Sequence, residues 1–181
     1  MFTGDAFGIS YRPTLRKFRI SETTKPFRFM GFSFGSLPDN MKDFLFPSSS
    51  PSDFEPKEAH EAIDRILKTG AERAFLTHGA LWDDMKLGAM QMHYGIQQYA
   101  LIMEELIARM KDAEARKTQV DEDELYNHAL SKMRKFFEEE LQKHGLKHED
   151  PAVWDLLQTD IELNAQGLVI AARSFKDKPV M

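Results

Sequence analysis

Two segments decide the fold expected of this chain: Phe2-Thr-Gly-Asp-Ala-Phe-Gly-Ile-Ser-Tyr-Arg12 and Phe75-Leu-Thr-His-Gly79. Each has a short apolar run that leads to a polar residue and a glycine, as a buried strand does where it turns out of a sheet. We therefore expect Asp5 and His78 at the carboxyl ends of strands. Ligand sites gather at that edge of an α/β sheet, because the backbone turns away and leaves side chains facing a crevice.

The residue types at this edge are compatible with metal binding. A carboxylate and an imidazole suit a zinc-type ion. Each residue also has a purely structural explanation, in which Asp5 caps a turn and His78 is a hydrogen-bonded histidine at a strand end. The position at a strand end is the only feature of the pattern that favours the metal, so both explanations stay open at this point.

The chain divides into an aromatic first part and a helical second part. Ten of the 14 Phe lie at or before Phe54. The alternation in Phe27-Arg-Phe29 and Phe32-Ser-Phe34 predicts a half-buried hairpin. From Pro56 onward the apolar spacing becomes helical, with capping residues and glycines as boundaries. We expect a helix from Pro56 to just before Gly70, a buried strand over 73–77, and further helices around 99–110, from Asp121 to Gly145 and from Asp150 to about Leu168.

Composition excludes several classes of protein. The 181 residues suffice for one domain, or one domain plus a fragment. The absence of cysteine excludes disulfides, thiolate metal sites and a cysteine nucleophile. A net charge of −5 argues against a nucleic-acid partner, and no apolar run approaches the roughly 20 residues of a membrane helix. We expect a cytoplasmic protein that binds neither nucleic acid nor membranes.

Three more segments, together with the two quoted above, carry a resemblance to a known family. They are Phe46-Pro-Ser-Ser-Ser-Pro51, Phe54-Glu-Pro56 and Asp160-Ile-Glu-Leu-Asn-Ala-Gln-Gly167. In this order the five segments resemble the second half of a metallo-β-lactamase-fold hydrolase of a bacterial glyoxalase II-like branch, from Met1 to about Arg173. The resemblance implies an α+β (α/β) protein with two regions. The C-terminal half of an αββα sandwich spans 1–83, including an extended insertion over 13–45, and a helical region spans 84–181.

The same resemblance assigns metal ligands. In that superfamily the Asp after Thr-Gly bridges two metal ions and the His after the late strand ligates one, which points to Asp5 and His78. Two zinc ions about 3.5–4 Å apart activate a shared water, which attacks an ester, a thioester or a similar bond of a small molecule. Iron or manganese also suits these ligands. Tyr11, Trp82 and His93 are candidates for lining the pocket, although Trp82 also suits a packed aromatic at a helix start and His93 a core or surface position.

The expected site is incomplete. The family's first metal motif, His-x-His-x-Asp-His, should precede this segment, and none of the six histidines forms a His-x-His pair. Two metals need more ligands than Asp5 and His78 supply. We therefore expect half of a hydrolase, as a truncated product, a split subunit or a partial polypeptide, whose partner is the missing N-terminal half or a second copy of the chain.

Two alternatives to the hydrolase stay open. One is a non-catalytic helical interaction or dimerisation module, because amphipathic helices beside an incomplete sheet leave apolar surface uncovered. The other is an inactive truncated product. In either case the last helix needs an anchor, and we expect Asp160 and Asn164, four residues apart on one face, to provide it by hydrogen bonds.

Overall fold

The computed structural model describes residues 1–18, 27–29, 32–34, 43–49, 54–79 and 81–180. The protein is mostly helical. No helix in these ranges combines the length and the apolar character needed to cross a lipid bilayer. In chain order the elements are η1 (Gly4–Phe7), α1 (Arg12–Leu15), η2 (Arg16–Phe18), β1 (Phe27–Phe29), β2 (Phe32–Phe34), α2 (Pro56–Lys68), β3 (Ala74–Phe75), β4 (Leu81–Trp82), α3 (Met85–Ala115), α4 (Glu122–Lys143) and α5 (Pro151–Ser174).

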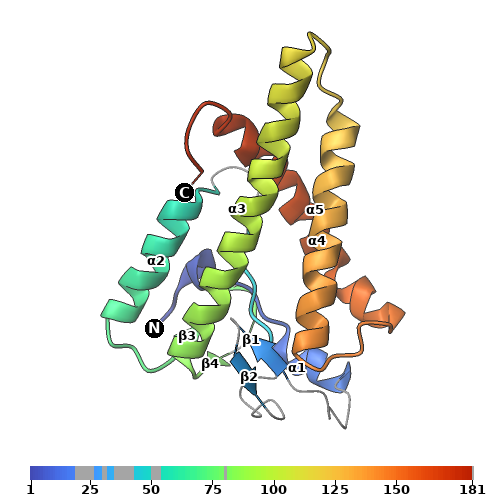
Figure 1. The fold of residues 1–181 in the computed structure, drawn as a ribbon. Coiled ribbons are helices and arrows are strands. Elements are labelled where there is room, and N and C mark those ends of the chain that lie inside the picture. The colour runs from blue at the N-terminus through green and yellow to red at the C-terminus, as the bar shows by residue number, and fades with distance from the viewer. Residues whose placement is uncertain (19–26, 30–31, 35–42, 50–53, 80, 181) are drawn as a thin grey trace.

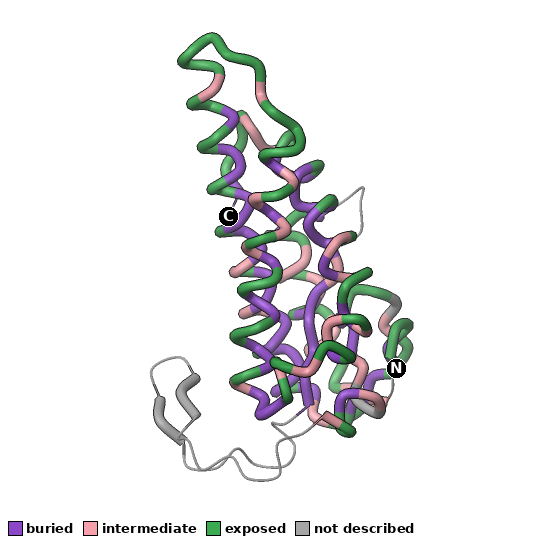
Figure 2. The backbone as a smooth tube through the Cα atoms, turned by 90° about the vertical axis from the view of Figure 1, so that its right-hand side faces the viewer, coloured by how far each residue is buried: buried purple, intermediate pink, exposed green. Residues whose placement is uncertain are grey.

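The helices form a bundle around α3 (Figure 1). Helices α3 and α4 run antiparallel as a long hairpin, α5 packs against both of them, and α2 packs along α3. The N-terminal segment, β3 and β4 lie at the end of the bundle away from the α3–α4 turn. That turn is exposed to solvent (Figure 2).

Three of the helices begin where their sequences predict, and two of them also end there, whereas α5 continues to Ser174, beyond the predicted end near Leu168. Helix α2 starts at Pro56 and stops before Gly70. Asp121 caps α4 by accepting backbone N–H groups of Asp123 and Glu124, and Asp150 caps α5 in the same way through Ala152. A side-chain oxygen at this position satisfies backbone donors that the first helical turn leaves without partners. The three predicted helix starts are confirmed.

Helix α3 begins at Met85, well before the predicted start near Tyr99. The prediction started too late because two glycines interrupt the apolar pattern of the helix. Gly88 and Gly95 lie inside the helix at points where other groups press on its backbone. A Cβ on Gly88 would lie 2.5 Å from Nε1 of Trp82, and a Cβ on Gly95 would lie 2.5 Å from Cδ of Pro47. The glycines therefore permit close packing and do not end the helix, although glycine usually weakens a helix interior.

The strands are short. Strands β1 and β2 pair antiparallel with Phe27 opposite Phe34, which confirms the predicted pairing, whereas the predicted half-burial of this hairpin stays a prediction. Strand β3 covers two residues of the predicted 73–77 strand and pairs with β4. Isolated bridges join Phe2 and Ile9 to the segment from Phe75 to His78. At this level the protein is α+β, and the described residues contain no continuous sandwich sheet. Of the expected 13–45 insertion, residues 19–26, 30–31 and 35–42 lie outside the described ranges.

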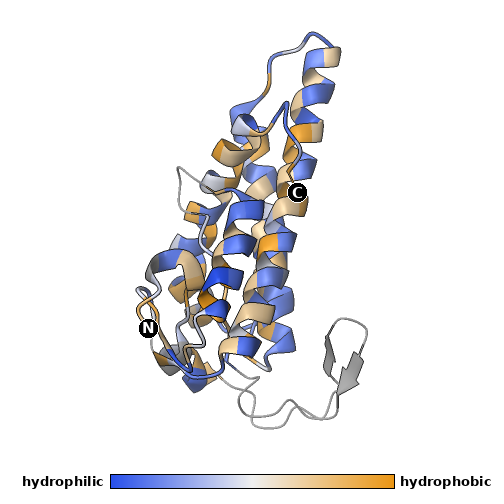
Figure 3. Cartoon of the chain, turned by 90° about the vertical axis from the view of Figure 1, so that its left-hand side faces the viewer, coloured by the Kyte–Doolittle hydropathy of each residue, from blue (hydrophilic) through white to orange (hydrophobic). Residues whose placement is uncertain are grey.

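The hydrophobic core is continuous between the two predicted regions. Phe46 and Phe44 from the first region place their ring centroids 4.9 and 5.7 Å from that of Phe137 on α4. Tyr99 of α3 is fully buried and donates its hydroxyl hydrogen to the Pro47 carbonyl at 3.1 Å. Apolar and polar positions alternate along the helices (Figure 3), as expected where one face of each helix packs inward. The division at residue 83 stays a prediction.

Candidate functional site

The structure brings together the two residues predicted as metal ligands. Oδ1 of Asp5 lies 3.4 Å from Nε2 of His78, and the two side chains are 58% and 57% exposed. Among the described residues, no group of three or more His, Asp or Glu side chains is arranged to hold a metal ion. Asp5 and His78 therefore form an open pair of potential ligand atoms at the protein surface.

Unequal pairing between two chain segments explains how Asp5 reaches His78. Phe2 bridges to Phe75, and Ile9 bridges to His78, both in parallel register. From one bridge to the next, the N-terminal segment runs seven residues, from Phe2 to Ile9, whereas its partner segment runs three, from Phe75 to His78. The N-terminal segment therefore has four extra residues, which loop out of the strand pairing. Those residues form η1 (Gly4–Phe7), which carries Asp5. Asp5 thus lies on a short helical turn beside the sheet edge.

The backbone around this turn is closely packed. Gly8 follows η1 with φ of +84°, in the left-handed region that favours glycine. A Cβ at Gly8 would collide with the sulfur of Met92 on α3 and lie 2.7 Å from the Phe46 carbonyl oxygen. A Cβ on Gly79, next to His78, would lie 2.7 Å from the Ser10 carbonyl oxygen. The turns that follow Asp5 and His78 are therefore packed against neighbouring backbone, and the first of them also against α3.

Tyr11 connects this edge to α5. Its hydroxyl donates a hydrogen bond of 2.8 Å to Oδ2 of Asp160. Burial, together with this bond, raises the pKa of Tyr11 to about 12. Burial also raises the pKa of Asp160, although the Tyr11 bond and the charge of nearby His78 act in the opposite direction. Asp160 therefore belongs to the surroundings of the site, a role that the sequence did not indicate beyond its expected function as an anchor of α5.

Asp5 also lines a cavity of about 430 Å³ between η1, the loop at Pro47 and helices α2 and α3. Its wall mixes apolar side chains with charged ones. Phe54, Met92 and Ile96 supply apolar surface, while Glu55, Glu58 and Arg65 supply charge. A small molecule with one apolar part and one polar part fits such a lining.

Two predicted pocket residues have other surroundings. Trp82 lies in the hydrophobic core, and its indole N–H donates to the Asp84 carbonyl at 2.7 Å, directly before α3. It is a packed aromatic at a helix start, which was the alternative explanation. His93 contacts His60 and Asp64 of α2. Sequence patterns do not predict the His60–His93 contact, because it depends on which faces of α2 and α3 meet.

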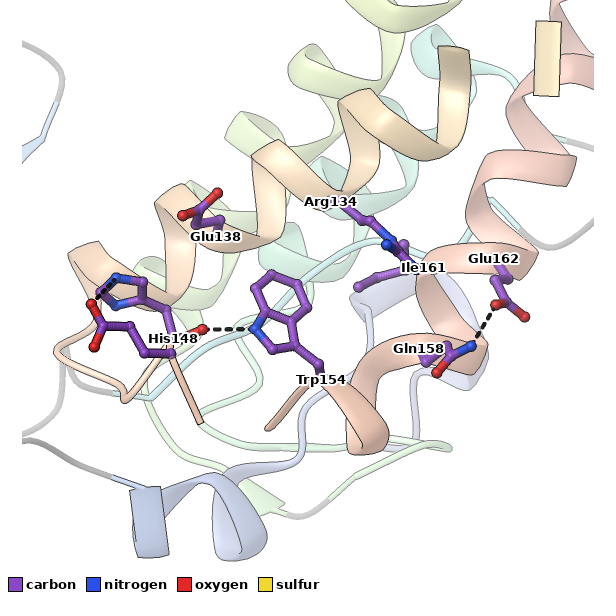
Figure 4. A pocket seen from close by; sticks show the side chains of 8 residues that line it. Arg134, Glu138, His148, Trp154, Gln158, Ile161 and Glu162 are labelled. Carbon is purple, nitrogen blue, oxygen red and sulfur yellow. Dashed lines mark hydrogen bonds and ion pairs between the residues drawn. The ribbon is translucent and has the colours of Figure 1, made fainter. Parts of the chain in front are cut away.

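A second and larger cavity, of about 510 Å³, lies away from Asp5 and His78 (Figure 4). Its walls come from α4, α5 and the segment that joins them, and two of its polar groups are hydrogen-bonded to neighbours. Nε1 of Trp154 donates to the His148 carbonyl at 2.7 Å, and the Gln158 amide donates to Glu162 at 2.8 Å. The lining residues are Arg134, Glu138, His148, Glu149, Trp154, Gln158, Ile161 and Glu162. They are scattered in the sequence and form no motif.

Comparison of the chain with protein-family models, with curated proteins and with solved structures finds no match. Function therefore rests on the geometry and chemistry of specific side chains, because a fold alone does not determine an activity.

Proposed function

We propose that this chain is part of a cytoplasmic metal-dependent hydrolase of the metallo-β-lactamase fold, in which Asp5 bridges two metal ions and His78 ligates one of them. The observation that carries the proposal is the contact between Oδ1 of Asp5 and Nε2 of His78, two residues far apart in the sequence. The αββα sandwich half over 1–83 and the helical region over 84–181 belong to the same proposal.

The separation of the two atoms fits a zinc ion. Zinc binds carboxylate oxygen and imidazole nitrogen at about 2.0–2.2 Å, so two ligands of one tetrahedral ion lie roughly 3.4 Å apart. Asp5 and His78 have that separation, 3.4 Å, with both side chains accessible to solvent. When bound, a pair of zinc ions would supply a hydroxide near neutral pH for attack on an ester, a thioester or a similar bond. Iron or manganese could replace zinc at these ligands.

We propose that the remaining ligands come from another polypeptide segment, since the described residues contain no group of three side chains that could hold a metal ion. The apolar edge beside the pair supports this step, because Phe2 is 85% exposed and Phe75 is 46% exposed. Their rings stack on each other with centroids 5.1 Å apart, and covering them with another segment would remove this apolar surface from water. We propose that a segment with a His-x-His-x-Asp-His motif covers this edge and completes the site.

Zinc titration followed by imidazole NMR tests the proposed ligands directly. We expect the His78 resonances to shift in a saturable manner as Zn²⁺ is added to the chain. Asp5→Asn should weaken this response at least about tenfold, because loss of a group that ligates or orients a ligand reduces metal affinity by such factors. Asp155→Asn, at an exposed aspartate of α5, is the matched control and should change nothing. A His78 signal that ignores millimolar Zn²⁺, or that responds equally in Asp5→Asn, would overturn the assignment.

A second candidate function is a non-catalytic module that docks on a second copy of the chain, and the exposed Phe2–Phe75 edge also favours it. Sedimentation at low concentration distinguishes the two. A dimer that Phe2→Ser dissociates, with His78 silent toward zinc, would support the module. Leu101→Ser, at an apolar residue of α3 with the same exposure as Phe75, is its control. A compact monomer counts against the module, and a broad, non-cooperative melt would indicate an inactive product.

A further inference from the structure

Two histidines from different helices meet at the α2–α3 interface. Nδ1 of His60 lies 2.6 Å from Nδ1 of His93, and the ring planes are inclined by only 18°. The ring centroids are 4.9 Å apart. The distance between the ring centroids exceeds the distance between the two Nδ1 atoms by about two imidazole radii. Both Nδ1 atoms therefore lie on the line between the centroids, so the rings meet edge to edge and each Nδ1 points at the other.

The neighbours of the two rings indicate how their protons are arranged. Nε2 of His93 lies 3.3 Å from Oδ1 of Asp64, a distance that favours the tautomer with its hydrogen on Nε2, toward the carboxylate. In that tautomer neutral His93 has a bare Nδ1, and His60 supplies the hydrogen between the rings. His60 Nε2 is left as a buried lone pair without a hydrogen-bond partner in the described part of the chain.

We propose that His60 and His93 form a metal site of their own, a two-histidine clamp that binds a zinc-class divalent ion between the two Nδ1 atoms and joins α2 to α3. Asp64 orients His93 through its other ring nitrogen, which is the usual arrangement of carboxylate, histidine and metal. Water completes the coordination sphere. The clamp does not depend on the proposed hydrolase, because it shares no residue with Asp5 and His78.

The geometry admits the ion after the rings separate and turn. Two nitrogen ligands of one tetrahedral zinc ion lie roughly 3.3 Å apart, and each lone pair must point at the ion, so the rings must separate by less than about 1 Å and each turn by about 35° from the line that joins the two Nδ1 atoms. His93 is one-third exposed, which gives the ion a route from solvent and the ring room to rotate. As the metal binds, the His60 ring turns and its Nε2, buried in the metal-free protein, reaches solvent. Nδ1 then gives its hydrogen to water and Nε2 takes one up, so neutral rings exchange one tautomer for another without net proton release.

The chemistry of the ring nitrogens sets which ions suit the clamp. A histidine binds a metal ion through its neutral imidazole form. Imidazole nitrogen suits zinc, copper and nickel, and zinc is the probe of choice because it is diamagnetic and has no redox chemistry.

The test uses the whole chain and Zn²⁺ alone, with imidazole NMR to identify the responding rings. We expect the His60 and His93 signals to shift together with one apparent Kd and the melting temperature to rise with zinc concentration. His60→Gln and His93→Gln should each raise that Kd at least about tenfold, and Asp64→Asn should raise it about tenfold. Glu61→Gln, at an exposed carboxylate of the same helix, is the matched control and should leave the Kd unchanged.

Variants at the other pair keep the two zinc proposals apart. His78→Gln should leave the His60 and His93 response intact, whether or not the Asp5–His78 pair binds metal. Signals of His60 and His93 that do not move at millimolar Zn²⁺, or a Kd that neither glutamine variant changes, would overturn the clamp. If a glutamine variant melts abnormally by circular dichroism, the residue-resolved shifts of the unaltered chain still decide the question.

Discussion

Replacement of Asn164 by alanine should destabilise the protein at one identifiable contact. Asn164 on α5 binds Ser49, which lies in the loop before α2. The Ser49 N–H donates to Oδ1 of Asn164 at 2.6 Å, and the Ser49 hydroxyl lies 2.9 Å from both Oδ1 and the Asn164 carbonyl oxygen. Both residues are almost fully buried, so water cannot replace a lost acceptor.

The expected loss follows from these contacts. Asn164→Ala leaves the Ser49 N–H buried without an acceptor, which costs about 1–3 kcal/mol. The Ser49 hydroxyl keeps the backbone carbonyl as its acceptor, whereas the space left by the amide costs about 1 kcal/mol more. We expect the free energy of unfolding to fall by about 2–4 kcal/mol in total. For a chain of this length the melting temperature should then fall by roughly 5–12 °C.

Urea unfolding followed by far-UV circular dichroism measures this change, with an unaltered m-value as the sign of a simple stability effect. Ser49→Ala is the matched control, because it removes the hydroxyl and keeps the N–H bond, and it should cost only about 0.5–1.5 kcal/mol. Gly167→Ala should damage the same contact sterically, since its Cβ would collide with the Ser49 carbonyl. A loss below about 0.5 kcal/mol in Asn164→Ala would refute the reasoning.

Two further predictions concern buried charges. Burial alone would raise the pKa of Glu140, but its interactions with His144 and Lys143 outweigh burial and lower it. The stability that this ionised carboxylate provides is present above its unfolded pKa and disappears as pH falls through the lower folded value. Glu140→Gln should therefore lower the free energy of unfolding by about 2–4 kcal/mol near pH 7, and by progressively less in acid. Urea unfolding at several pH values measures this loss, and a loss that does not change with pH would contradict the prediction. Tyr11→Phe removes the 2.8 Å bond to Asp160; it should cost about 1–2 kcal/mol and raise the pKa of Asp160 further, whereas an unchanged carboxyl titration by NMR would count against it.

The sequence predicted those helices whose ends are defined by local chemistry. A carboxylate that accepts the first N–H groups of a helix acts within a few residues, so Asp121 and Asp150 marked α4 and α5 correctly. Helix α3 was predicted too short because Gly88 and Gly95 are weak helix formers. Their purpose becomes visible only with the Trp82 and Pro47 side chains packed against them.

In the candidate site, too, features set by nearby residues were predicted and features set by packing were not. The sequence placed Asp5 and His78 at one edge, and they do lie side by side, yet Asp5 is on a helical turn that unequal pairing forces out of the ladder. A pattern of residue types predicts that two strand ends meet, but it does not predict the register between them. The His60–His93 contact lay further beyond reach, since one residue of offset between α2 and α3 would separate the rings.

The helical region determines the positions of groups around a site whose proposed ligands both lie before it. Glycine at position 8 lets the turn after Asp5 adopt a positive φ, and its missing Cβ also leaves room for Met92 of α3 to pack against the turn. On the other side, Tyr11 reaches the Asp160 carboxylate of α5. A shift of α3 or α5 would therefore move both flanks of the Asp5–His78 pair, and an atom separation suited to zinc tolerates only a few tenths of an ångström. Packing of the bundle and geometry of the Asp5–His78 pair are thus coupled through Gly8 and Tyr11, so substitutions at either residue should alter the proposed zinc binding, although neither residue is a proposed ligand.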